Sequence, residues 1–112
     1  MLNDSSWFVV QTQAGKERLA AAHLGRQGFE TLFPQLWRSV RRSRKSVNVL
    51  KPMFPGYVFV NVDMERMRWR AINSTVGVSK LVRFGEKPAA LPLELIQTLS
   101  SNIGEDGAVV FD

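Results

Sequence analysis

The chain of 112 residues contains no cysteine and only one histidine, His23. The absence of cysteine excludes a disulfide framework and thiolate metal sites, and a single histidine excludes a histidine metal cluster. Long apolar runs are absent too, and residues 1–6 are polar, so we expect neither a signal peptide nor a membrane span. The length fits one domain with a single hydrophobic core, and we expect a cytoplasmic, monomeric protein.

Groups that could carry out catalysis are also scarce. The 10 acidic residues are scattered along the chain, and the close pair Asp63 and Glu65 is explained by the start of a helix. One histidine offers no basis for a Ser-His-Asp arrangement, and Gly15-Lys16 lacks the earlier glycine of a phosphate-binding loop. We therefore expect a binding module that is not an enzyme and needs no cofactor or metal.

Acidic residues are missing between Glu30 and Asp63, where six Lys and Arg residues occur. Over the whole chain 15 Lys and Arg outnumber 10 Asp and Glu, and the net charge of +5 favours an anionic partner. Apolar residues within 36–40 and 47–50 flank the densest part of this run, which predicts a hairpin with a basic tip. Nucleic-acid phosphates are the expected ligand of the tip residues Arg41, Arg42, Arg44 and Lys45.

The stretch Lys51–Val62 carries the most regular pattern of the chain. Two prolines and Gly56 shape its first half, and a strand with strict alternation follows. The valines at the even positions of 58–62 point to one face of that strand and form an ordinary core row. Tyr57 and Phe59 point to the other face, where rigid aromatic rings either lie buried under helices or form a docking surface.

The remaining patterns predict four sheet strands, the hairpin and three helices. This order indicates an α/β (α+β) sandwich in which an antiparallel four-stranded sheet, related to the ferredoxin-like fold, is flanked by three helices. Residues 1–103 are expected to form this domain, and the acidic, glycine-containing residues 104–112 to start a linker. The expected strands are 7–12, 29–33, 57–62 and 79–84, and the expected helices are 16–27, 64–73 and 92–102.

One interpretation of the aromatic strand is an RNA-recognition domain. Gly56–Val60 (Gly-Tyr-Val-Phe-Val) overlaps the RNP1 pattern, in which alternate aromatic residues stack on bases. Trp7–Val9 lies on the first strand, where the second motif of that fold belongs. The predicted element order is compatible with this alternative, which would make the chain a single-stranded RNA-binding domain.

A second interpretation rests on several short motifs that follow one another along the chain. These are Trp7–Val10 (Trp-Phe-Val-Val), Gly15-x-Glu17, Pro52–Val60 (Pro-Met-Phe-Pro-Gly-Tyr-Val-Phe-Val), Val76–Val78 and Val82–Gly85. Their order resembles the N-terminal (NGN) domain of NusG-type transcription elongation factors, and the match runs from Trp7 to Ile103. The segments 72–79 and 82–85 look closer to the specialised RfaH branch of this family.

The resemblance implies a non-enzymatic bacterial factor for transcription antitermination that binds RNA polymerase, bridges its cleft and reduces pausing. In this family an apolar depression docks onto the clamp helices of the large polymerase subunit. A KOW domain follows the NGN domain, and in the RfaH branch it covers the same depression. The residues that match the depression here are Phe54, Pro55, Tyr57 and Phe59.

Two further contacts are implied by the resemblance. The start of the second predicted helix, with Arg68, Trp69 and Arg70, matches the segment that meets the gate loop of the other large polymerase subunit. The first predicted helix carries His23, Arg26 and Gln27 at i, i+3 and i+4, so these side chains share a face. In the RfaH branch this face and a following loop meet the non-template DNA strand. The resemblance thus implies nucleic-acid binding by His23, Arg26, Gln27, Asn73, Ser74 and Thr75. Arg18 is also expected to bind nucleic acid, as a positive charge that contacts the phosphate backbone.

Overall fold

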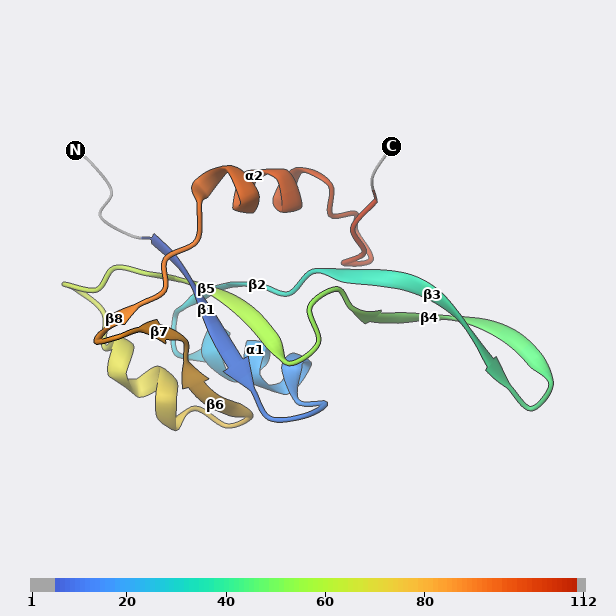
Figure 1. Cartoon of the computed structure of the whole chain (residues 1–112), viewed down its shortest axis with the longest axis horizontal. Coiled ribbons are helices and arrows are strands. Elements are labelled where there is room, and N and C mark those ends of the chain that lie inside the picture. Colours follow the sequence, from blue (N-terminus) through green and yellow to red (C-terminus); the bar gives the residue numbers. More distant parts are fainter. Residues whose placement is uncertain (1–5, 111–112) are drawn as a thin grey trace.

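The computed structural model describes residues 6–110 and contains a four-stranded antiparallel sheet (Figure 1). The sheet strands are β1 (Ser6–Thr12), β2 (Glu30–Leu32), β5 (Tyr57–Val62) and β6 (Val78–Leu81), in the order β2-β5-β1-β6. Helix α1 (Glu17–Arg26) connects β1 to β2, and β5 is inserted between these two strands. This is the split β-α-β arrangement of ferredoxin-like folds, so the predicted fold class is confirmed.

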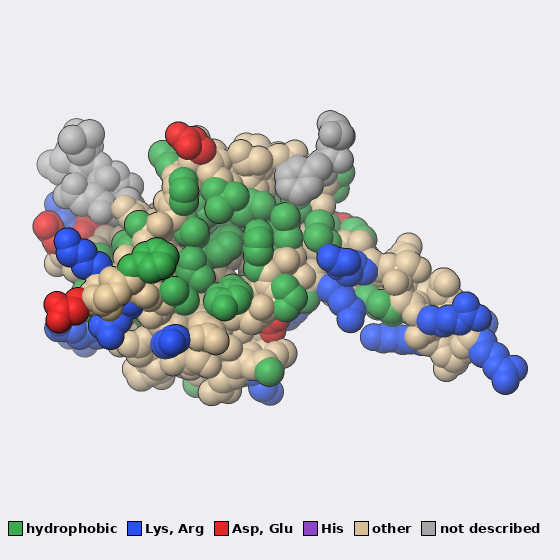
Figure 2. Space-filling model, viewed as in Figure 1, with side chains coloured by type: hydrophobic (Ala, Val, Ile, Leu, Met, Phe, Trp, Pro, Cys, Tyr) green, Lys and Arg blue, Asp and Glu red, His purple; other side chains and the backbone are tan. Residues whose placement is uncertain are grey.

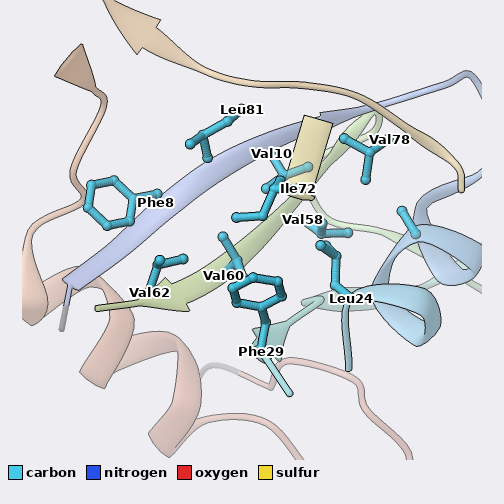
Figure 3. Close-up of a cluster of buried hydrophobic side chains, with 11 residues drawn as sticks. Phe8, Val10, Leu24, Phe29, Val58, Val60, Val62, Ile72, Val78 and Leu81 are labelled. Atoms are coloured by element: carbon cyan, nitrogen blue, oxygen red, sulfur yellow. The ribbon is translucent and has the colours of Figure 1, made fainter. Parts of the chain in front are cut away.

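One face of the sheet carries the main hydrophobic core (Figure 3). Val58, Val60 and Val62 of β5 are fully buried there, as their alternation predicts. Ala20 and Leu24 of α1 belong to the same cluster and are also fully buried. Burying one valine side chain contributes about 1.5 kcal/mol or more, so this row is a main source of stability.

Helix α2 (Leu93–Ser101) covers part of the opposite face. Phe59 is 5% exposed and clusters with Ile96 and Leu99 of this helix. The helix starts one residue later than predicted, because Pro92 is the cap rather than the first helical residue. The aromatic row of β5 is therefore divided, since Phe59 lies under a helix while Tyr57 stays exposed.

Strands β3 (Gln35–Arg42) and β4 (Lys45–Pro52) form the predicted hairpin, which projects from the body of the domain (Figure 1). Its two turn residues, Ser43 and Arg44, both have a positive φ, of 49° and 67°. Positive φ at both positions defines a type I′ turn, whose twist matches that of paired strands. The hairpin makes the molecule elongated, with principal extents of 52, 31 and 27 Å.

The prediction of an α-helix over 64–73 is wrong. Residues 64–66 form turns, and a short 3-10 helix, η1 (Trp69–Ser74), follows them. The Asp63 carboxylate accepts hydrogen bonds from the two backbone N–H groups at 65 and 66, at 3.1 and 3.3 Å, and thereby closes a local turn. At the other end two hydroxyl groups donate to the Ala71 carbonyl oxygen, so side-chain hydrogen bonds compete with a regular helix.

The predicted strand 79–84 is split in two. β6 ends at Leu81, and β7 (Arg83–Phe84) pairs with β8 (Lys87–Pro88) as a separate small hairpin. The backbone of Val82 explains the break. Its N–H donates a hydrogen bond to the Val9 carbonyl of β1, and its own carbonyl accepts one from the Ala89 N–H, which directly follows β8. Val82 thus ends the contact with the main sheet and starts the small hairpin.

Residues 104–110 fold back against the base of the large hairpin. The Val109 N–H donates to the Gln35 carbonyl oxygen at 2.7 Å, and a bridge joins Gln35 to Ala108. Ala108 and Val109 are both buried. The role of this segment as the start of a linker stays a prediction, and its last residues, 111 and 112, lie outside the described part of the chain.

Gly77 lies between η1 and β6, in close contact with α1. Its φ is +85°, and an added Cβ would lie 3.0 Å from the backbone nitrogen of Ala20. We expect Gly77→Ala to lower the free energy of unfolding by about 2–4 kcal/mol, because the positive φ and the clash both cost free energy. Gly85→Ala is the matched control, since Gly85 also has a positive φ, of +62°, but faces open space. Equal losses of stability in urea unfolding would contradict the tight packing of the Gly77 turn on α1.

Candidate protein- and nucleic-acid-binding surfaces

An apolar surface lies beside α2 on the face of the sheet away from α1. Its floor is formed by Phe59, Ile96 and Leu99, and partly buried side chains form its rim. Figure 2 shows hydrophobic side chains gathered between α2 and the sheet. The rings of Phe54 and Phe59 lie 5.4 Å apart between centroids and are tilted by 53°, a packed aromatic pair. We call this surface the apolar face, and its rim consists of Trp7, Val9, Leu32, Met53, Phe54 and Leu91.

The residues predicted to bind polymerase occupy different depths of this surface. Phe59 belongs to the floor, so it supports the surface from below and does not present its ring to solvent. Tyr57 lies outside the rim, at the start of β5 on the same side of the strand as Phe59, and is 39% exposed. Phe54 is half-buried on the rim. Pro55 is exposed in the turn before β5. Tyr57 and Phe54 are therefore the two aromatic residues of the block that a partner can reach.

A buried carboxylate holds the loop that carries Phe54 and Pro55. Glu17 is 6% exposed, and its Oε2 accepts a hydrogen bond from the Gly56 backbone N–H at 3.2 Å. The Gly56 carbonyl accepts from the Thr12 N–H at 2.8 Å, so the loop is tied to both α1 and β1. In the sequence, Glu17 stood out only as the last residue of a short family motif. Its place in the motif Gly15-x-Glu17 was the one signal of this positioning role.

The face of α1 expected to meet DNA lies beside the end of η1, because the expected loop 73–75 consists of the last two residues of this 3-10 helix and its cap Thr75. Gln27 Nε2 donates to Thr75 Oγ1 at 2.7 Å. Thr75 is 7% exposed, and Asn73 Oδ1 accepts from a β6 backbone N–H at 2.7 Å, so both side chains hold the loop in place. His23 is half-buried on this face. The exposed members of the predicted set here are Arg26, Gln27, Asn73 and Ser74.

A hollow of about 500 Å³ lies between the end of α1 and the segment before η1. Arg68 and Met67 line it on one side and Gln27 on the other. Arg68 therefore belongs to the surface at the end of α1, whereas Arg70 lies over the Trp69 ring, 5.1 Å from its centroid. Trp69 packs half-buried against the main core. Two exposed arginines and one core-anchored ring thus make up the predicted gate-loop segment.

The basic side chains of the hairpin are exposed along both strands. Figure 2 shows Lys and Arg side chains from the base of the hairpin to its tip. Among residues 6–110 the single ion pair joins Arg66 to Asp63 at 3.7 Å, so the hairpin charges have no acidic partner within the domain. Arg18 lies at the base of the hairpin, where its Nη2 donates to Gln35 Oε1 at 3.0 Å. Its guanidinium therefore helps to join α1 to β3.

A surface contact joins β3 to the C-terminal segment. The Trp37 indole N–H donates to Asp106 Oδ2 at 2.8 Å, and Asp106 Oδ1 accepts from the Ala108 backbone N–H at 2.9 Å. The hydrogen bond from Ala108, followed by the one from Trp37, lowers the pKa of the Asp106 carboxyl below its ordinary value of 3.8. Trp37 remains 52% exposed, so this contact lies on the surface of the domain.

Residues 6–110 lack two features, a metal site and a membrane-spanning helix. No group of three or more His, Cys, Asp or Glu side chains there could hold a metal ion. No helix within 6–110 is long and apolar enough to cross a membrane. A ferredoxin-like sheet with an apolar face on one side and a projecting basic hairpin defines an α/β binding domain.

The family of this binding domain follows from its sequence. A family model described as "Transcription termination factor nusG" matches residues 5–100. The chain therefore belongs to the NusG family, whose members are transcription factors and not enzymes. The resemblance stated from the motifs is confirmed at the level of this family, and so is the expectation that the chain is not an enzyme.

Three relatives share the name transcription termination/antitermination protein NusG. The protein from Deinococcus radiodurans is 30% identical over 117 aligned positions, which cover 88% of this chain and 62% of that protein. The one from Bacillus subtilis is 30% identical over 115 positions, with 92% and 65% covered. The one from Helicobacter pylori is 28% identical over 95 positions, with 76% and 54% covered. The chain thus spans 54–65% of the length of these curated relatives.

A solved structure titled "Domain interaction in Thermotoga maritima NusG" has the same fold. It superposes with a TM-score of 0.57 at 20% identity and covers 84% of this chain and 54% of that chain. These relatives do not separate the RfaH branch from other NusG proteins, so that finer assignment stays a prediction. The RNA-recognition alternative is not supported.

The Trp37–Asp106 contact should depend on pH in a defined direction. Because the folded-state pKa of Asp106 is lowered, its contribution is present above the ordinary value of 3.8 and is lost as the pH falls through the lowered value. We expect the Trp37 indole N–H resonance, assigned with Trp37→Phe, to shift only in that acidic range. Asp106→Asn should abolish the transition, and a transition that persists in this variant would contradict the contact.

Proposed function

We propose that this chain is the polymerase-binding domain of a bacterial NusG-type factor that acts in transcription elongation and antitermination. Family membership and the names of the relatives support a role in transcription. The observation that carries the proposal is the apolar face, with the Phe-Pro-Gly-Tyr block at its edge. This face offers a protein partner an aromatic and aliphatic surface on a rigid sheet.

The apolar face is suited to a helical partner, and we assign it to the clamp helices of the large polymerase subunit. An amphipathic helix places apolar side chains one turn apart into a groove of this kind. Tyr57 and Phe54 are the accessible anchors, and Phe59 supports them from the floor. Pro55 and the Glu17–Gly56 hydrogen bond hold the loop in position.

The segment Arg68–Arg70 is the proposed second contact, with the gate loop of the other large subunit. Both arginines are exposed, and the core-anchored Trp69 fixes the backbone between them. Arg70 lies over the Trp69 ring, which orders its side chain before a partner arrives. A domain held by both subunits bridges the polymerase cleft, and this is the proposed route by which it reduces pausing.

Nucleic acid is the proposed partner of the surface at the end of α1 and of the hairpin. Arg26, Gln27 and Ser74 are exposed near the loop 73–75, and we assign the non-template DNA strand to this surface. Gln27 already donates to Thr75, so phosphate contact through Arg26 is favoured over base reading. Within residues 6–110 the hairpin cations have no acidic partner, which suits phosphate binding without sequence preference.

The full-length protein is proposed to contain a second domain and to act in the cytoplasm. The relatives are longer than this chain, which supports a C-terminal KOW domain of the family type. Such a domain is a candidate occupant of the apolar face when polymerase is absent. We propose that the protein is a monomer and that its NGN domain is the part that contacts polymerase.

Truncation of Tyr57 tests the assignment of the apolar face. Loss of an aromatic anchor from an interface costs about 2 kcal/mol, or roughly thirtyfold in Kd. We expect Tyr57→Ala to weaken binding to a purified clamp-helix fragment by this factor, measured by fluorescence anisotropy. Phe84→Ala is the matched control, because Phe84 is 79% exposed but lies on the β7–β8 hairpin, which contributes no residue to the floor or rim of the apolar face.

Truncation of the buried Phe59 is expected to affect stability as well as binding. Phe59→Ala should cost about 3–5 kcal/mol of stability, so its effect on binding is interpretable only beside an unfolding curve. The wild-type chain is also tested for association with core RNA polymerase in a pull-down. No association there, with Tyr57→Ala binding the fragment as tightly as wild type, would show that the proposed function is wrong.

Charge removal tests the role of the hairpin tip. Each lost phosphate contact reduces the slope of log Kd against log salt by about 0.9 for duplex DNA. Serine at all four tip positions should therefore make this slope shallower by up to about 3.6. An unchanged slope would leave the tip as a solvated turn. The substituted residues are Arg41, Arg42, Arg44 and Lys45.

A further inference from the structure

The register of the large hairpin sorts its side chains between two faces. Alternate residues of a strand point to opposite faces, and directly opposed residues of two strands share a face. The pairs Arg38–Val49 and Arg42–Lys45 therefore lie on the same face, together with Leu36–Lys51. We call this the basic face, and it consists of Leu36, Arg38, Val40, Arg42, Lys45, Val47, Val49 and Lys51.

The opposite face of the hairpin is polar and holds a single base, Arg41. Trp37 projects from this face, and its indole N–H reaches the Asp106 carboxylate at 2.8 Å. A negative charge from the C-terminal segment therefore lies on this side of the ribbon. We call it the polar face, and it consists of Gln35, Trp37, Ser39, Arg41, Ser46, Asn48, Leu50 and Pro52.

The four cations of the basic face have no acidic partner among residues 6–110. Arg38, Arg42, Lys45 and Lys51 are exposed, and the ion pair recorded within 6–110 lies elsewhere, between Arg66 and Asp63. Each strand of the ribbon carries two of these cations, so positive charge lines both of its long edges. Valines fill the space between them, and Val47 is 37% exposed.

We propose that the basic face binds the backbone of duplex DNA, with the hairpin lying as a two-stranded ribbon along a groove. This inference rests on the proposed nucleic-acid role of the hairpin and names its ligand and its face. The major groove of B-form DNA, about 12 Å wide, admits a two-stranded ribbon, and the two charged edges then reach the phosphates on both sides.

Two other nucleic acids fit the basic face less well. Trp37 is the one aromatic residue of the hairpin, and it lies on the polar face, held by Asp106. The basic face therefore lacks the aromatic platform on which single-stranded bases stack. Duplex RNA has a deep and narrow major groove that does not admit such a ribbon. The arrangement thus favours duplex DNA.

A swap that conserves net charge tests whether DNA binding depends on which face of the hairpin carries the cations. The combined changes Arg38→Ser, Ser39→Arg, Lys45→Ser and Ser46→Lys move two cations from the basic face to the polar face. Composition and net charge stay the same. Binding of the 112-residue chain to a short duplex of mixed sequence is measured by anisotropy across a series of salt concentrations. The matched control is Ser79→Lys with Lys80→Ser, which moves one exposed cation between the faces of β6.

The swap should reduce the salt slope by about 1.8, because two phosphate contacts are lost. A fourfold rise in salt would then weaken wild-type binding about twelvefold more than binding of the swap. The β6 control should keep the wild-type slope. An equal slope for the swap and the wild type would overturn the proposal, as would tighter binding of the wild type to single-stranded DNA or duplex RNA.

A second pair of variants covers the case in which the swap disturbs the hairpin, as judged by the Trp37 indole resonance. Arg38→Gln with Lys51→Gln removes two charges from the basic face, whereas Lys80→Gln with Lys87→Gln removes two exposed charges outside the β3–β4 hairpin. The first variant should lose about 1.8 in slope and the second much less. Equal losses would overturn the proposal. Polymerase pull-down is independent of these slopes, so failure of this inference and failure of the proposed function can be told apart.

Discussion

The two-sided burial of β5 is the constraint on which the rest of the structure depends. Its valines fill the core shared with α1, while Phe59 on the opposite face meets α2. Pairing with β1 on one side and β2 on the other holds this register. A slip of one residue would exchange the two rows and would bring Tyr57 and Phe59 into a core built for valine. The register of β5 therefore determines both the packing of the core and the shape of the apolar face.

The loop before β5 depends on this register as well. It enters the strand with Gly56 held between the Glu17 carboxylate and the Thr12 N–H. Glu17 is buried, and one protein hydrogen bond offsets part of the cost of removing its carboxylate from water. Tyr57 starts the strand directly after this point and remains exposed on the side of the strand that carries Phe59. Position, and not only residue type, thus separates an exposed aromatic side chain from a buried one.

The hairpin differs from β5, because its turn and its register depend on residues that are close in the sequence. A type I′ turn at Ser43 and Arg44 sets the register, and the register alone sorts the charges into a basic and a polar face. Its connection to the domain is tertiary, through Arg18 to Gln35 and through Asp106 to Trp37. These contacts orient a charged ribbon without placing any of its cations in the core.

The sequence by itself determined the ferredoxin-like class, the helix α1, the alternation in β5 and the basic hairpin, because each depends on short-range periodicity or on local charge. Tertiary structure decided that Phe59 lies under α2, that Glu17 holds Gly56, and that Gln27 and Thr75 meet across the domain. It also placed residues 104–110 against β3. These features depend on pairs of residues far apart in the chain, and a pattern read along one segment carries no record of which distant segment will cover it.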